Sequence, residues 1–381
     1  MKFRTLLAAA AGLLMASAAT AQTVKVGFIG PLTGGGAPWG IAAKVGIELA
    51  AKDHNDAGGL DIGGVKHQVE VISYDDKYAA ADAVAAYNRL VNQDGVKYIV
   101  LVSSSGTMAL KQNIEDDGVL AITASYSTQV LDDDTSQLFR LYSAPVSYVP
   151  PFIKWMAENL TERRVVIINP NDETGWDQTR LFKEHFGQNG FEVVGEELFE
   201  RTQSDFTPLI TKVMAMNPEI VEMGGTSPAT AGLIVRQARE LGYDGLFSKM
   251  GGAGPYDIVA AAGAEASEGI INMLYADQQN EGFKRLAAAY EASEGHVPNE
   301  ILVSFYDGTK VMLAAIAEGG DADDPVAAAA AFPKVLPMES VQGDNLRLGG
   351  SDLYGVDAEV LSVNYVGVIR DGEPVVIGKT E

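Results

Sequence analysis

Short apolar runs alternate with longer amphipathic stretches along almost the whole length of this chain. In the first half the apolar runs have the length and β-branched content of buried strands, at residues 24–30, 69–74, 97–102 and 119–123. The stretches between them have helical periodicity, at residues 39–55, 79–92 and 106–117. Because strands that alternate with helices pair in parallel, the pattern predicts a doubly wound parallel sheet with helices on both faces.

A second series of the same kind begins after Tyr142. Its strands are predicted at residues 164–169, 191–199, 220–224 and 246–250, and its helices at 146–160, 176–188, 206–216 and 229–241. Two α/β domains in series are the simplest interpretation of a chain of 381 residues. A helical stretch from Gly282 to Ala317 and a β-rich tail from Gly343 follow both series, so the tail has to return to one domain or the other.

The N-terminus has the organisation of a secretory signal. Lys2 and Arg4 precede an apolar run at residues 5–18, and Ala19-Thr20-Ala21 stands before Gln22. A basic start, an apolar run too short to span a bilayer stably and a small-residue exit are typical of a cleaved signal peptide. We expect residues 1–21 to be removed and the protein to be exported; a signal anchor is the alternative.

The composition limits the kinds of molecule that this protein can bind. The formal net charge is −23, and a surface this acidic repels nucleic acid and anionic lipid. The chain has no cysteine, which excludes disulfides, thiolate metal sites and a lipid-modified cysteine. After the signal, no segment is apolar for long enough to predict membrane insertion.

A glycine-rich loop, Gly27 to Gly40, joins the first predicted strand to the first helix, where dinucleotide-binding folds carry their phosphate loop. Its spacing is not G-x-G-x-x-G, and two prolines and Trp39 stand where the backbone would approach a pyrophosphate. Asp75 and Asp76 end the second strand in the position of a ribose-binding acid. The spacing and the export signal together argue against a nicotinamide enzyme.

Hydroxyl side chains follow two neighbouring strands. Ser103, Ser104 and Ser105 come after the apolar run that ends at Val102 and open a helix, and Ser125, Tyr126 and Ser127 end the next strand. Hydroxyls and unpaired N–H groups at a helix N-terminus suit a carboxylate. One such cluster is most simply a helix cap, but two at the carboxyl edge of one sheet favour a ligand site.

Catalytic and metal constellations are missing from the sequence. No G-x-S-x-G elbow occurs, and the four histidines lie in helix or loop contexts rather than beside a nucleophile. No two histidines stand at ligand spacing, and the acidic runs 132–134 and 321–324 lack the alternation of a calcium loop. We therefore predict no catalytic residues, no metal and no cofactor.

Several motifs follow one another in order along the chain: N-D-A-G-G-L at 55–60, Y-D-D at 74–76, S-D-F-T at 204–207, N-P-E at 217–219, G-G at 224–225, R-Q-A-R at 236–239 and L-G at 241–242. In this order they resemble the branched-chain amino acid (Leu/Ile/Val) binding proteins of ABC importers, from about Val24 to the C-terminus.

The resemblance implies a type I periplasmic-binding fold, a clamshell whose chain crosses three times between two lobes. The crossings are expected near residues 140–142, near residues 273–276 and near Asn345. The N-terminal lobe would then comprise residues 22–141 and 275–345, and the C-terminal lobe residues 142–274 and 346–381.

The family's ligand contacts map onto the hydroxyl clusters, at Ser103 to Ser105 and at Ser125 and Ser127. Its cleft aromatic maps onto Trp39, and Trp176 is expected near the cleft as well. On the second lobe the corresponding positions are Thr174 and, after the G-G pair, Thr226 or Ser227.

This chain departs from the family at the positions that would hold an amino group. Thr174 and Thr226-Ser227 stand where the family carries tyrosines, and the acid that would face an ammonium falls at Ala253 or Gly252. An ammonium without a carboxylate partner is costly in a closed cleft. The ligand is therefore expected to be a carboxylate without an α-amino group, and Lys249 is a candidate to face it.

The resemblance implies a monomeric periplasmic binding protein that captures a small solute and hands it to the permease subunits of an ABC importer. Delivery to a chemoreceptor uses the same physics and stays open at this point. An exported α/β enzyme is the alternative from another class, and it would need a nucleophile with its base, or a metal.

Overall fold

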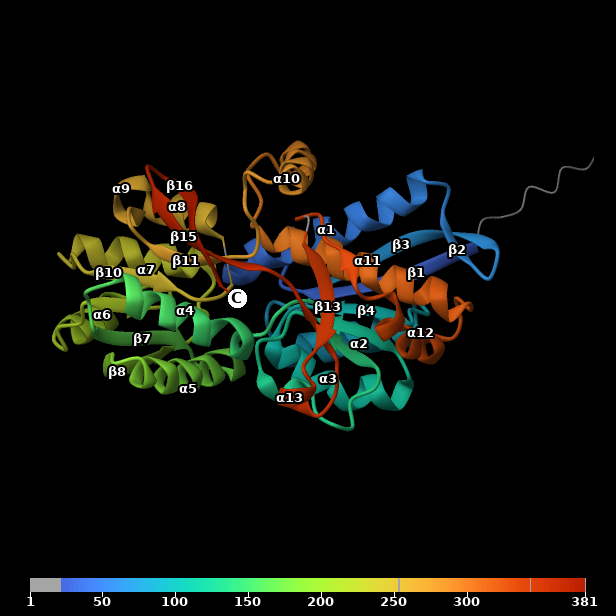
Figure 1. The fold of residues 1–381 in the computed structure, drawn as a ribbon, viewed down its shortest axis with the longest axis horizontal. Helices are drawn as coiled ribbons and strands as arrows, with labels where there is room; N and C mark the ends of the chain where they lie inside the picture. The colour runs from blue at the N-terminus through green and yellow to red at the C-terminus, as the bar shows by residue number, and fades with distance from the viewer. Residues whose placement is uncertain (1–21, 253, 343, 381) are drawn as a thin grey trace, which may run out of the picture.

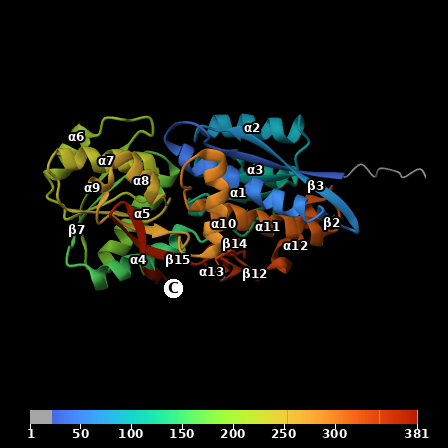
Figure 2. The same cartoon turned by 90° about the horizontal axis from the view of Figure 1, so that it is seen from above.

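The structure of the protein, a computed structural model, describes residues 22–252, 254–342 and 344–380. The expected signal peptide at residues 1–21 and the departure at Ala253 lie outside the described residues. The chain forms two lobes side by side, each with its own sheet covered by helices (Figures 1 and 2).

The first sheet has nine strands in the order β12-β13-β14-β6-β5-β4-β1-β3-β2. Its strands are β1 (Gln22–Gly30), β2 (Leu60–Ile62), β3 (Val65–Asp75), β4 (Tyr98–Leu101), β5 (Leu120–Thr123), β6 (Leu138–Arg140), β12 (Met338–Glu339), β13 (Asn345–Gly349) and β14 (Glu359–Leu361). Its helices are α1 (Ala37–Asp56), α2 (Ala80–Asn92), α3 (Ser104–Asp117), α10 (Glu281–Glu294), α11 (Ile301–Gly319), α12 (Pro325–Ala331) and α13 (Ser351–Tyr354). The central strands pair in parallel and are apolar on both faces, because helices cover both sides.

The second sheet has seven strands in the order β16-β15-β11-β10-β9-β7-β8. Its strands are β7 (Arg164–Pro170), β8 (Glu192–Phe199), β9 (Ile220–Glu222), β10 (Leu246–Lys249), β11 (Ile271–Leu274), β15 (Asn364–Arg370) and β16 (Glu373–Thr380). Its helices are α4 (Pro145–Asn159), α5 (Glu173–Gln188), α6 (Thr207–Met214), α7 (Pro228–Glu240), α8 (Pro255–Ala262) and α9 (Ala264–Ser267). Strands β2, β13, β15 and β16 pair antiparallel, so the sheets are parallel in the middle and mixed at the edges.

The third crossing differs from the prediction near Asn345. Strands β13 and β14 belong to the first sheet, and the chain passes to the second sheet only between β14 and β15. The segment 346–361, expected in the C-terminal lobe, therefore lies in the first one. The physical reason is burial, because Leu346 and Val360 pack into the core of that lobe.

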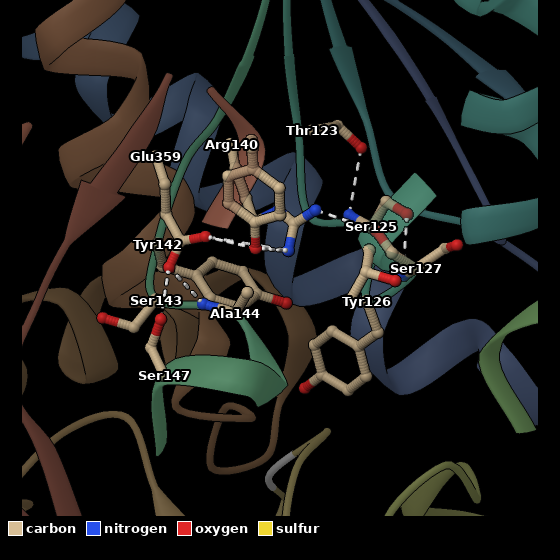
Figure 3. A network of polar contacts seen from close by, with 12 residues as sticks. Thr123, Ser125, Tyr126, Ser127, Arg140, Tyr142, Ser143, Ala144, Ser147 and Glu359 are labelled. Carbon is tan, nitrogen blue, oxygen red and sulfur yellow. Dashed lines mark hydrogen bonds and ion pairs between the residues drawn. The ribbon is translucent and has the colours of Figure 1, made fainter. Parts of the chain in front are cut away.

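A buried polar network joins the connections between the lobes (Figure 3). Glu359 on β14 lies 3.8 Å from the guanidinium of Arg140 on β6, and both side chains are fully buried. The Glu359 carboxylate also accepts the N–H of Ala144 at 2.8 Å and the hydroxyl of Ser147 at 2.9 Å, at the start of α4. One carboxylate thus ties the first crossing to the strand that precedes the third.

Candidate functional site

The carboxyl ends of the central strands of the first sheet face the second lobe, and the loops that leave them meet the second lobe's loops at a cleft. A small cavity of about 20 Å³ lies there. Residues of both lobes line it, and they are Trp39, Tyr78, Val102, Ser104, Ala124, Tyr126, Tyr142, Thr174, Gly252 and Ile301. Open α/β folds bind ligands at this edge of the sheet, which makes the cavity the candidate site.

Four aromatic side chains, Trp39, Tyr78, Tyr126 and Tyr142, form much of the wall. The Trp39 ring lies 5.9 Å from the ring of Tyr78, and the Trp39 Nε1–H donates to the carbonyl of Gly252 at 3.0 Å. The Tyr126 hydroxyl accepts the N–H of Gly252. Because Trp39 and Tyr126 belong to the first lobe and Gly252 to the second, these bonds connect the lobes across the cleft.

Each lobe places a helix N-terminus at the cavity through a glycine that packs closely on the end of the preceding strand. A Cβ on Gly40 in α1 would lie 1.7 Å from the carbonyl oxygen of Pro31, and a Cβ on Gly175 in α5 would lie 1.7 Å from that of Pro170. Only glycine therefore allows the helix to pack so closely on the end of the preceding strand. Thr174, in the first turn of α5, faces the cavity as a result.

Ser104 is the first residue of α3. Among the serines predicted in the first lobe, it is the one that lines the cavity. Its Oγ accepts the N–H of Tyr126 at 3.0 Å and that of Ser127 at 3.4 Å. The Ser104 proton is therefore left to donate, beside the N–H groups that the first turn of α3 cannot pair internally.

Two of the predicted serines bond across the cleft to the other lobe. The Ser105 hydroxyl donates to the carboxylate of Glu173, and the Ser127 hydroxyl donates to that of Asp177 at 2.6 Å. Both acids belong to α5. These serines hold the lobes together in this arrangement and do not line the cavity.

The other two predicted serines of the first lobe support the local backbone. Ser103 caps α3 by accepting the N–H of Gly106 at 3.1 Å, and its hydroxyl donates to the buried Asp76 at 3.0 Å. Ser125 Oγ accepts the N–H of Ser127 at 3.3 Å. Burial raises the pKa of Asp76 to about 6.

Apart from Thr174, the predicted residues of the second lobe do not line this cavity. Thr226 is buried and donates to the carbonyl of Ile168 at 3.2 Å. Ser227 caps α7 and lines a larger hollow of about 590 Å³ at the mouth of the cleft. Lys249 is buried, and its ammonium donates to the carbonyls of Gly251 and Gly252, the latter at 2.7 Å.

Arg201 closes one side of the mouth. Its guanidinium carbon lies 3.9 Å from the centre of the Tyr78 ring, and it forms an ion pair with Asp172, the N-cap of α5. The Tyr78 hydroxyl lies 3.4 Å from the Thr174 hydroxyl. Burial raises the pKa of Tyr78 to about 12, so the phenol keeps its proton at neutral pH.

Sequence reasoning found Trp39, Ser104, Tyr126 and Thr174 among the cavity residues and missed the rest. Tyr78 follows the Asp75-Asp76 pair at the end of β3, a position that the edge rule could have singled out. Ile301 comes from the start of α11, which the sequence placed inside one long helix, so no local signal marked it. Trp176 is half-exposed and donates to Asn171 instead of lining the cavity.

A metal site and a membrane-spanning helix are both absent from the described residues. These residues include no cluster of acidic, histidine or cysteine side chains suited to a metal ion. Among the helices of residues 22–252, 254–342 and 344–380, none is long and apolar enough to cross a membrane.

The fold and the cleft define a type I periplasmic binding protein, and comparison with known proteins agrees. Residues 23–352 match the family described as periplasmic binding protein, so the chain belongs to that family. The family consists of binding proteins, and the chain is accordingly not an enzyme.

Among curated relatives, the chain is 31% identical over 306 residues to the leucine-, isoleucine-, valine-, threonine- and alanine-binding protein of Pseudomonas aeruginosa, covering 80% of each chain. Among solved structures, it is similar to a leucine-binding protein of Thermotoga maritima, with a TM-score of 0.81, 22% identity and coverage of 94% and 99%. A solute-binding protein of an ABC transporter from R. palustris, solved with benzoate, gives a TM-score of 0.80, 21% identity and coverage of 94% and 96%.

Proposed function

We propose that this protein captures a small carboxylate-bearing solute in the periplasm and delivers it to the permease subunits of an ABC importer. The ligand would lie between the lobes, and the two lobes would close over it about the three connections. Relatives that bind leucine, isoleucine and valine support the transport role, as does the transporter-associated neighbour solved with benzoate.

The lining of the cavity carries the proposal for the ligand class. Its polar groups are hydroxyls, the indole N–H of Trp39 and the backbone of Gly252, and none of the described residues that line it is acidic. A ligand carboxylate can accept from Ser104 at the N-terminus of α3 and from Thr174 at the N-terminus of α5, where both helix dipoles favour negative charge. An ammonium would lack a carboxylate partner among these residues, and a buried unpaired charge is costly.

The walls favour an apolar body behind that carboxylate. Trp39, Tyr78, Tyr126 and Tyr142 surround the cavity with Val102 and Ile301. Aromatic walls of this kind bury a branched or aromatic hydrocarbon group well. We therefore propose an organic acid with such a group and without an α-amino group.

A thermal-shift screen tests the proposal. Branched or aromatic monocarboxylic acids, with benzoate among them, should raise the melting temperature more than leucine, isoleucine or valine, because ligand at a hundred times its dissociation constant adds about 2.7 kcal/mol. A larger shift with a branched-chain amino acid would show that the cleft neutralises an ammonium after all.

A further inference from the structure

A group of ionisable side chains lies behind the loop that carries Gly251 and Gly252. Glu222 on β9 and Lys249 on β10 come from neighbouring strands of the second lobe, and Asp257 comes from α8. Glu300 stands at the N-cap of α11. Glu222, Lys249 and Glu300 are almost completely buried, and Asp257 is partly so.

Glu300 reaches this group from the other lobe. Helix α11 packs against α1 of the first lobe, so Glu300 is anchored there. Its Oε2 accepts the N–H of Gly254, at the start of α8, at 3.1 Å. Beside it, the Asn299 side-chain amide donates to Asp257 at 3.0 Å. These contacts exist only while the two lobes are together.

The Glu300 carboxyl group is not neutralised in this position. Within the part of the chain that the structure describes, no basic side chain forms an ion pair with it, and its Oε1 has no hydrogen-bond partner. The ammonium of Lys249 is bonded to the carbonyls of Gly251 and Gly252, and its charge lowers the pKa of Glu300 by less than burial raises it. The facing acid, Asp257, adds repulsion.

The other ionisable groups around the site do not supply the missing charge. Tyr256 donates its hydroxyl to Glu373 at 2.9 Å, and Ser248 and the N–H of Met250 bond to Glu222. The nearby His296 lowers the pKa of Asp257. Burial is the largest cause that raises the pKa of Glu300 to about 8 and that of Asp257 to about 6.

We propose that Glu300 takes up a proton as the lobes close, which makes closure, and with it ligand capture, weaken as the pH rises. The inference rests on the hinge closure proposed above. When the lobes separate, Glu300 loses Gly254 and the neighbouring Asp257 and returns toward its ordinary acidity. The closed arrangement is therefore favoured at low pH, because its carboxyl group holds a proton that the open one releases.

The sign and the size follow from this linkage. Between pH 5 and 7, the closed form keeps the Glu300 proton and the open form does not, so the closing constant falls by up to about tenfold for each pH unit. Burial lowers the pKa of Lys249 to about 7, which keeps its own titration at the upper limit of this window. Between pH 5 and 6, below the Lys249 titration, the slope therefore belongs to the carboxyl groups.

Infrared spectra of the ligand-free protein at pH 5, where the proposal makes the closed arrangement most favoured, test the first half of the proposal. The difference spectrum, in which the spectrum of Glu300→Gln is subtracted from that of wild type, should contain the band of a protonated carboxyl group. The matched control, Glu281→Gln, removes an 89% exposed side chain and should remove mainly an ionised carboxylate. A difference spectrum of Glu300→Gln that contains mainly an ionised carboxylate overturns the proposal.

Solution scattering between pH 5 and 7 tests the second half. The radius of gyration of ligand-free wild type should increase with pH, and Glu300→Gln should respond less steeply. If Glu300→Gln does not fold, Asp257→Asn serves, since removal of the facing acid should lower the pH at which the Glu300 band disappears. Parallel responses of wild type and variant would refute the coupling. Because no ligand is present, a failed thermal-shift screen would sink the transport proposal without touching this result.

Discussion

The buried pair of Arg140 and Glu359 allows a quantitative test of how the connections between the lobes are held. Replacement of Glu359 by alanine leaves the Arg140 guanidinium without a counter-charge in a fully buried position. It also removes the acceptor of the Ala144 N–H and of the Ser147 hydroxyl. Loss of one partner from a buried ion pair typically costs about 3–5 kcal/mol.

Urea unfolding of Glu359→Ala should therefore show a free energy of unfolding about 3–5 kcal/mol below that of wild type. The control is Asp323→Ala, which removes an exposed ion pair with Lys97 at 2.8 Å and should cost about 0–1 kcal/mol. Equal losses in the two variants, or a loss below about 1 kcal/mol in Glu359→Ala, would refute the reasoning.

Two further variants probe the contacts across the cleft. Ser127→Ala removes the hydrogen bond to Asp177. In calorimetry it should weaken binding of the best acid from the screen by about 1.5–3 kcal/mol, with little change in the melting temperature of the ligand-free protein. A lowered melting temperature with unchanged affinity would mean that Ser127 acts only as a local cap. Gly252→Ala places a Cβ 2.5 Å from the Trp39 ring at a φ of +51°, so it should displace the indole and change its fluorescence, and emission identical to that of wild type would contradict the Trp39 contact.

The order of strands and helices could be predicted from sequence because hydrophobic periodicity is a local property. Strand β4 and helix α3, for example, lie within a few residues of their predicted positions. The long helical stretch from Gly282 to Ala317 is in fact two helices, α10 and α11. Helix α10 ends at Glu294 and is capped by Gly295, whose φ of +80° is the left-handed conformation that glycine adopts readily.

The site was predictable only where chain position determined it. Ser104 and Thr174 follow strands and open helices, and the edge rule therefore brought them to the cavity. The roles of Ser105 and Ser127 depend on acids in α5 of the other lobe, a contact between distant parts of the chain that no local pattern encodes. The same applies to Glu300, which lies in the unpredicted break between α10 and α11.

The ligand that accompanies the protein on purification is the most direct test of the central claim. Native mass spectrometry of the protein exported by a bacterial host, followed by denaturation and identification of the released molecule, measures it. The account predicts one small carboxylic acid bound per chain, without a primary amine and with a branched or aromatic group. A released branched-chain amino acid would contradict the assignment of the cleft to an acid that carries no ammonium.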